Sequence, residues 1–191
     1  MNDQELVLKI INMETLNFNK LLLKTAFSCM ACDGDIDKRE VKLIKQLQRE
    51  NKTFGEIDIN SELDILLLAI NKDGHQFLKD YFNELKTSEL SEANELKLVE
   101  VAIGTIKADD KVEYSEIKFF KVIRSKLKIE NDSILEKHPD FEEYLEQDII
   151  SESYLARLQD DFFDTQVIPE FELISKIDND ILKNLEGVNE E

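Results

Sequence analysis

One pattern of residues occurs twice in this chain, at a spacing of 76 positions. When Asp33 is aligned with Asp109, several further residues align as identities. The identical pairs include Ala26/Ala102, Glu40/Glu116, Lys42/Lys118 and Lys45/Lys121. Because an internal repeat defines the structural unit that recurs in a fold, we expect two copies of one unit.

Both copies carry apolar residues at the i, i+3, i+4 spacing of a buried helix face. At the same offset, eight apolar positions of the first copy align with apolar positions of the second: Leu22/Leu98, Leu23/Val99, Phe27/Ile103, Met30/Ile106, Ile36/Val112, Val41/Ile117, Ile44/Phe120 and Leu47/Ile123. Each copy therefore predicts a helix, an acidic loop and a second helix. The predicted ranges are 16–31, 33–36 and 37–50 in the first copy, and 91–107, 109–112 and 113–128 in the second.

Further helices are expected outside the two copies. Residues 3–13 predict a short leading helix, and Ser61 is a candidate N-cap for the segment LDILLLAI. Asp73-Gly74 predicts a break before HQFLKDYFNEL. With only 5 glycines and 2 prolines, the composition also favours helices over a turn-rich β fold.

His138-Pro139 predicts a boundary, because the residue before proline is pushed out of the α region. We expect a helical domain over residues 1–138 and a partly helical C-terminal extension over 139–191. Asp140 with Glu143 is typical of a capping box that opens a helix. The extension contains clustered phenylalanines that are costly to leave in water, so we expect it to dock on the body or on another subunit. These are Phe162, Phe163 and Phe171.

Acidic residues outnumber basic ones by 42 to 24, which gives a net charge of −18. This charge repels phosphate backbones and anionic lipids, so nucleic acid is not an expected partner. No secretory signal is visible at the start of the chain, and no apolar segment approaches the roughly 20 residues needed to span a bilayer. We expect a cytoplasmic protein that does not insert into membranes.

The chain lacks the usual catalytic motifs, so a self-contained enzyme is not expected. Cys29 and Cys32 form a C-x-x-C pair, but no second pair completes a zinc site. They lie in an apolar helical segment, where a reduced cysteine behaves as a small buried hydrophobe. His75 and His138 are isolated, and we expect both to be exposed loop residues.

The two loops concentrate carboxylates, which are the hard oxygen ligands preferred by calcium and magnesium. The candidate metal ligands are Asp33, Asp35, Asp37 and Glu40 in the first loop, and Asp109, Asp110, Glu113 and Glu116 in the second. Neither loop is an EF-hand. In the first, Lys38 replaces the required glycine and Ile44 replaces the bidentate glutamate.

Helix capping offers an alternative account of the same residues. Asp37 followed by Glu40 is an N-cap pattern, and Glu113 with Glu116 places negative charge at the positive end of a helix dipole. Asp33 and Asp109 follow the preceding helix, where an acidic residue opposes the local dipole. Both interpretations, capping and cation binding, therefore remain open.

At these loops the chain resembles the tellurite-resistance TerB family, whose signature is a helix of small residues that runs into A-D-G-x-[IV]-x-x-x-E and then an amphipathic helix. The matching segments are ACDGDIDKRE (31–40) and ADDKVEYSE (108–116), and the resemblance covers residues 15–128. Cys32 replaces the usual alanine of the first copy, and Asp110 replaces the glycine of the second. The resemblance implies an all-α, pseudo-twofold bundle of about seven helices built from two helix, acidic loop, helix repeats. It further implies a metal site at Asp33, Glu40, Asp109 and Glu116.

Two classes of function follow. The first is a non-catalytic sensor or adaptor in bacterial stress response, tellurite resistance or phage defence, which binds a divalent metal ion such as Ca, Mg or Mn. The second is a metal-free helical interaction module whose acidic surface binds a basic protein. Membrane-associated protein partners are implied by the resemblance, and a homodimer is compatible with either class.

Overall fold

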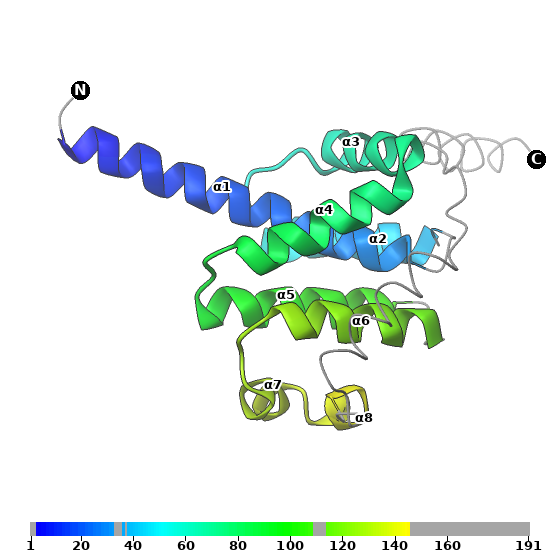
Figure 1. Ribbon diagram of the computed structural model, residues 1–191. Helices are drawn as coiled ribbons and strands as arrows, with labels where there is room; N and C mark the ends of the chain where they lie inside the picture. The colour runs from blue at the N-terminus through cyan, green and yellow to red at the C-terminus, as the bar shows by residue number, and fades with distance from the viewer. Residues whose placement is uncertain (1–2, 33–35, 37, 109–113, 146–191) are drawn as a thin grey trace, which may run out of the picture.

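Figure 1 shows the computed structural model, which describes residues 3–32, 36, 38–108 and 114–145. These residues form α-helices joined by loops, with one 3-10 helix and no strand among them. The helices are α1 (Asp3–Met30), α2 (Lys38–Asn51), α3 (Ile59–Lys72), α4 (Gly74–Thr87), α5 (Glu92–Ile106), α6 (Tyr114–Lys126), α7 (Asn131–Lys137), η1 (Pro139–Phe141) and α8 (Glu142–Leu145). The predicted all-α class is confirmed.

Helix α1 is one continuous element of 28 residues, so the prediction of separate helices over 3–13 and 16–31 was wrong. No glycine or proline interrupts this stretch, and a helix without such a residue has no local reason to break. Residues 21–30 are buried apart from the half-buried Lys24, whereas residues 12–17 are all exposed. In Figure 1 the first half of α1 extends beyond the rest of the bundle.

The two predicted units correspond to α1–α2 and α5–α6. Their first helices end at Met30 and Ile106, and their second helices begin at Lys38 and Tyr114. Both pairs of positions are 76 residues apart. Helix α1 packs along α5, while α2 contacts α5 and α6 contacts α1. Each unit thus contacts the first helix of the other through its second helix.

The apolar faces of both units meet in one core. The six residues expected to pack the repeats together are all buried: Leu22, Phe27, Ile44, Leu98, Ile103 and Phe120. Helix α4 adds aromatic rings to this core, because Tyr81 and Phe82 both pack against Phe119 of α6. The prediction that these helix faces form the core is confirmed.

The start of α3 differs from the prediction. Its N-cap is Asp58, whose carboxylate accepts a hydrogen bond of 3.4 Å from the backbone N–H of Ser61. Ser61 therefore lies within the first turn and does not cap it. Asp73 ends α3 and also caps α4, where it accepts a hydrogen bond of 3.0 Å from the N–H of Gln76. The predicted break at Asp73-Gly74 is confirmed.

Residues after Pro139 also belong to the core. Phe141 and Leu145 are buried, and the ring of Phe141 meets that of Phe120 edge to face at 5.6 Å. Asp140 lies inside η1 and pairs with Lys107, the C-cap of α5, so it does not open a helix as a capping box. The remainder of the expected extension, residues 146–191, lies outside the described residues.

In the part of the chain that the structure describes, no helix is both long enough and apolar enough to cross a membrane.

Candidate functional site

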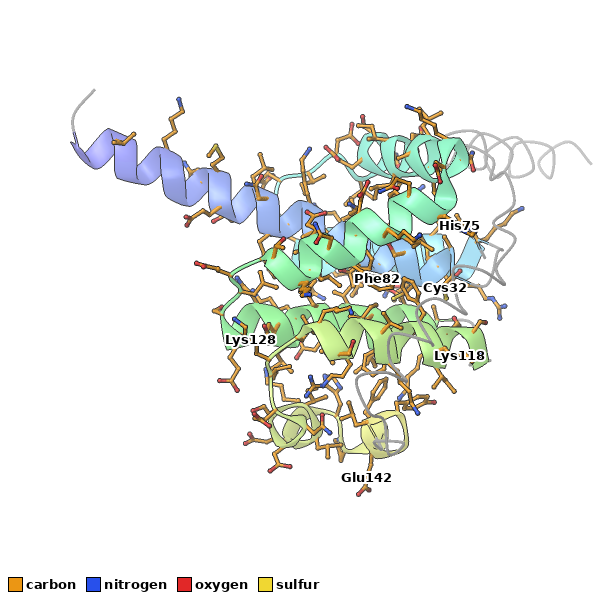
Figure 2. The ribbon with its side chains drawn as sticks, in the orientation of Figure 1. Cys32, His75, Phe82, Lys118, Lys128 and Glu142 are labelled. Atoms are coloured by element: carbon orange, nitrogen blue, oxygen red, sulfur yellow. The ribbon has the colours of Figure 1, made fainter. Side chains whose placement is uncertain are left out.

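Residues that flank the two acidic loops lie toward one end of the bundle. Figure 2 shows Cys32, which directly precedes the first loop, and Lys118, which follows the second, on the same side of the molecule. Lys128, which follows the end of α6, lies on the opposite side. Residues that flank the two loops are therefore on one side of the molecule, where α1 packs against α5.

Two of the eight predicted metal ligands, Glu40 and Glu116, lie in the described residues. Glu40 is in the first turn of α2 and is 6% exposed, and Glu116 is in the first turn of α6 and is 5% exposed. A first-turn carboxylate is favoured by the helix dipole, as the capping interpretation predicts. Capping does not require burial, however, because a cap can remain in water. Burial of both side chains is therefore a separate feature of this site.

Both glutamates affect the pKa of the buried thiol of Cys29. Burial raises the pKa of its thiol well above the ordinary value, and the carboxylates of Glu40 and Glu116 raise that pKa further. Both glutamates thus act electrostatically on one buried group, although they come from different repeats. The thiol stays protonated at neutral pH, and a protonated thiol is neither a nucleophile nor a metal ligand.

The cysteines have the structural role expected from their apolar surroundings. Neither Cys29 nor Cys32 forms a disulfide bond, and both are buried. Position 105, which aligns with Cys29, holds the buried residue Thr105 in the second repeat. A small buried side chain therefore occupies this position in both repeats.

The polar surroundings of Cys29 include residues that the sequence did not single out. The hydroxyl of Tyr81 donates a hydrogen bond of 3.0 Å to Oγ1 of Thr25, and Thr25 donates one of 2.9 Å to the carbonyl of Leu21. Burial, followed by the proximity of Cys29, raises the pKa of Tyr81 well above its ordinary value. Tyr81 occupies an apolar position of its helix pattern, so the sequence predicts it as core but gives no sign of its partner.

The other six predicted ligands lie outside the described residues: Asp33, Asp35, Asp37, Asp109, Asp110 and Glu113. Within the described ranges no three His, Cys, Asp or Glu side chains are grouped so as to hold a metal ion. Glu40 and Glu116 supply hard oxygen donors, which suit calcium, magnesium or manganese. They are too few to complete a coordination sphere, so any cation would also need carboxylates from the loops.

Neither histidine is an exposed loop residue, contrary to the prediction. His75 lies in the first turn of α4 and is half-buried. His138 is also half-buried, and its Nε2 lies 3.7 Å from Oε1 of Glu100 on α5. A histidine before proline can be covered by a distant helix, and the local sequence does not show this.

A third buried carboxylate has a structural explanation. Glu95 on α5 accepts hydrogen bonds from the backbone N–H groups of Lys128 and Ile129, at 2.8 and 2.6 Å. Arg124 binds the carbonyl of Ile129 in the same connection. These bonds fix the loop between α6 and α7, so Glu95 has a complete role without a ligand.

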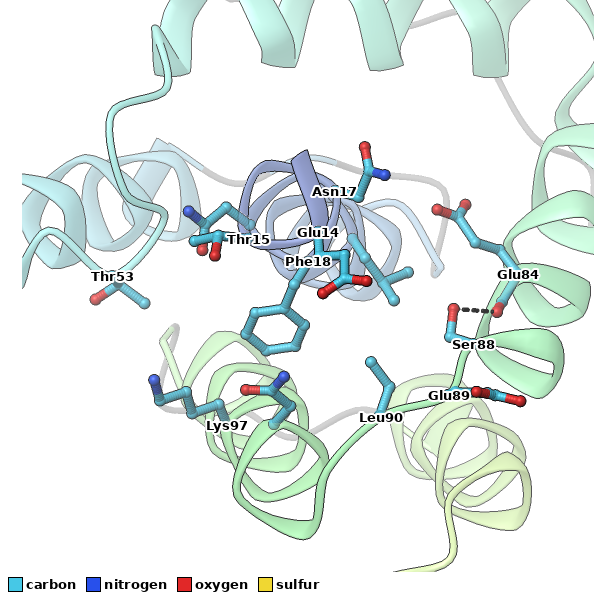
Figure 3. Close-up of a pocket in the computed structure, with 13 residues that line it drawn as sticks. Glu14, Thr15, Asn17, Phe18, Thr53, Glu84, Ser88, Glu89, Leu90 and Lys97 are labelled. Atoms are coloured by element: carbon cyan, nitrogen blue, oxygen red, sulfur yellow. Dashed lines mark hydrogen bonds between the residues drawn. The ribbon is translucent and has the colours of Figure 1, made fainter. Parts of the chain in front are cut away.

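A groove of about 570 Å³ opens beside the middle of α1. In Figure 3 Phe18 and Leu90 point into it from opposite sides, and Ser88 donates a hydrogen bond of 2.7 Å to the carbonyl of Glu84 at its edge. No lining residue comes from α2, α6 or the acidic loops, and none is a histidine or a cysteine. The groove is therefore separate from the candidate site.

Comparisons of the chain with protein-family models, curated proteins and solved structures find no match.

Proposed function

We propose that the protein is a non-catalytic, cation-responsive adaptor of the TerB-like type, which acts in bacterial stress response, either tellurite resistance or phage defence. The observation that carries this proposal is the burial of Glu40 and Glu116 in the first turns of α2 and α6. Both carboxylates also raise the pKa of the Cys29 thiol. These glutamates occupy equivalent positions of the repeat and are both buried. The resemblance of the two loop segments to the TerB signature supports the same function.

The proposed mechanism uses the electrostatics of this site. Carboxylates that lie close together repel one another, and a bound cation lowers that repulsion. A hard divalent cation would be held by Glu40 and Glu116 together with the loop aspartates. Because each loop joins two helices of one repeat, binding would stiffen both repeats at once. A partner protein that recognises this end of the bundle would then sense the cation.

A metal-free interaction module is the second candidate. It is favoured by the first-turn position of both glutamates, since negative charge there stabilises a helix without any ligand. In this case the acidic surface would bind a basic protein, including one attached to a membrane. The net charge of −18 supports such a partner in either case.

Thermal unfolding in the presence and absence of metal separates the two candidates. A cation that binds only the folded state stabilises it by RT ln(1 + [L]/Kd), or about 2.7 kcal/mol at a hundredfold excess over Kd. We expect millimolar calcium, magnesium or manganese to raise the Tm of the wild-type protein relative to chelator. The increase should be lost in Glu40→Gln/Glu116→Gln and in Asp33→Asn/Asp109→Asn.

A matched control is Glu89→Gln/Asp132→Asn, which removes the same charge from two exposed positions away from the loops. This variant should keep the full response to metal. If no metal stabilises wild type more than the Glu40/Glu116 variant, the loops are helix caps and the metal-free module replaces the cation-responsive adaptor.

A further inference from the structure

The groove of about 570 Å³ beside the middle of α1, here called the α1 groove, contains apolar side chains that water still reaches. Phe18, Leu21 and Leu90 supply these side chains, and Figure 3 shows Phe18 and Leu90 pointing into the groove from opposite sides. Leu21 is buried, whereas Phe18 and Leu90 are only half-buried. Removal of such apolar surface from water favours association with a partner. The α1 groove therefore offers a place for apolar anchor residues.

Uncharged polar side chains make up much of the remaining lining. They include the amides of Asn17 and Asn19 on α1 and of Asn94 on α5. A side-chain amide both donates and accepts hydrogen bonds, so it can pair with polar side chains of either kind on a partner. A purely apolar ligand would leave these amides unpaired, which costs free energy. The α1 groove therefore suits a partner that is apolar on one side and polar at its edges.

Charge determines which partners the α1 groove attracts. Its charged lining residues are Glu14, Glu84, Glu89 and Lys97. Glu84 pairs with Lys24 at 2.8 Å, while Glu14 and Glu89 are exposed. The groove thus carries excess negative charge, as the whole chain does with its net charge of −18. A basic partner is attracted, whereas a second copy of this chain, a nucleic acid or an anionic lipid surface is repelled.

The dimensions of the α1 groove suit a helix. Its lining on α1 runs from Glu14 to Leu21, which is about 11 Å, or roughly two turns, at a rise of 1.5 Å per residue. The described residues contain no strand whose edge a peptide could extend, so docking of a helix into a groove is the applicable mode of recognition. A helix bound in this way presents apolar anchors at i, i+3 or i+4, and i+7.

We propose that the α1 groove binds a basic amphipathic helix of a partner protein. The apolar face of that helix packs between Phe18 and Leu90, and its basic residues lie near Glu14 and Glu89. This inference deepens the proposed function, because it gives the adaptor a docking surface and rests on that function only for the existence of a protein partner. It does not depend on cation binding, since no residue of the acidic loops lines the α1 groove.

Nuclear magnetic resonance of the isotopically labelled full-length protein tests this proposal. Chelator is present throughout, so that cation binding at the acidic loops does not affect the result. The probe is a synthetic peptide of lysine and leucine, with leucine at the i, i+4, i+7, i+11 spacing of one helical face. We expect saturable shifts of backbone signals that concentrate in residues 14–21 and 88–97. Two control peptides, with glutamate in place of lysine or alanine in place of leucine, should not produce these shifts.

Charge reversal in the groove provides a matched comparison, with peptide affinity measured by fluorescence anisotropy. Glu14→Lys/Glu89→Lys should weaken peptide binding roughly tenfold, because it turns two modest attractions between exposed charges into repulsions. Glu136→Lys/Glu142→Lys makes the same charge change at two exposed positions outside the groove. This control should retain affinity within about twofold of wild type, because salt screens charges that are distant from the peptide.

Truncation of an apolar side chain tests the anchor site separately. Leu90→Ala should weaken peptide binding, whereas Leu68→Ala, at an exposed position of α3 outside the groove, should not. Circular dichroism of each variant verifies that the helices are intact. The proposal would be overturned by an absence of saturable binding, by shifts that concentrate outside the α1 groove, or by equal binding of the alanine-substituted peptide. Equal losses in the groove variants and their controls would also overturn it.

Discussion

The hydroxyl of Tyr81 donates a hydrogen bond of 3.0 Å to Oγ1 of Thr25 and so ties α4 to the buried side of α1. Thr25 lies one helical turn before Cys29, and all three side chains are buried. The pair therefore forms part of the polar surroundings of the thiol on which Glu40 and Glu116 act.

Removing either partner of this hydrogen bond should have unequal effects. Tyr81→Phe should lower the free energy of unfolding by about 1 kcal/mol, because Thr25 keeps its hydrogen bond to the carbonyl of Leu21. Thr25→Val should cost about 1–3 kcal/mol, because it leaves the buried hydroxyl of Tyr81 without an acceptor. Urea unfolding followed by circular dichroism measures both changes. A larger loss in Tyr81→Phe than in Thr25→Val would contradict the assignment.

Alkaline pH should destabilise the protein through Cys29. The pKa of the thiol in the folded state lies above its ordinary value of 9.0, so above pH 9 the unfolded chain loses this proton while the folded chain retains it. The free energy of unfolding should then fall by up to about 1.4 kcal/mol per pH unit for this group. Unfolding experiments between pH 7 and about 10.5 should show a shallower alkaline decline in Cys29→Ala. Identical slopes in both proteins would count against a raised pKa.

Glu95 should be essential for the loop between α6 and α7. Glu95→Gln replaces a buried carboxylate that accepts two backbone hydrogen bonds, and hydrogen bonds to charged groups contribute about 1.5–3 kcal/mol. We expect a loss of about this size in chemical unfolding. The control is Glu92→Gln, one turn earlier on the exposed side of α5, which should change stability by less than about 0.5 kcal/mol. Equal effects of the two substitutions would show that the hydrogen bonds of Glu95 are not important.

Core and surface positions should respond differently to truncation. Phe27 is fully buried and meets the ring of Phe77 edge to face at 5.8 Å, so Phe27→Ala should cost about 3–5 kcal/mol. Leu68 on α3 is 61% exposed, and Leu68→Ala should change stability by no more than about 0.5 kcal/mol. Thermal and urea unfolding of the two variants provides the measurement. A large cost at Leu68 would show that this exposed side chain is covered in solution.

Local sequence patterns predicted the all-α class and the buried helix faces, but not the continuity of α1. The 76-residue offset predicts equivalent ends for the two repeats, and Met30 with Ile106 confirms it. Apolar residues at helical spacing identified Phe27 and Phe120 as core, because this periodicity records the side of a helix that avoids water. Where two local signals competed, the sequence was less decisive. Asp58 and Ser61 are both good N-caps, and the structure uses Asp58.

Only the tertiary structure decided which distant residues meet. Glu40, Glu116 and Cys29 lie in separate segments of the sequence. In the folded protein both carboxylates raise the pKa of the Cys29 thiol. Helix packing also places Glu100 of α5 beside His138, although a histidine before proline looks like an exposed loop residue. The physical reason is that helix periodicity and capping depend on neighbours within a few positions, whereas burial of a polar group depends on partners tens of residues away.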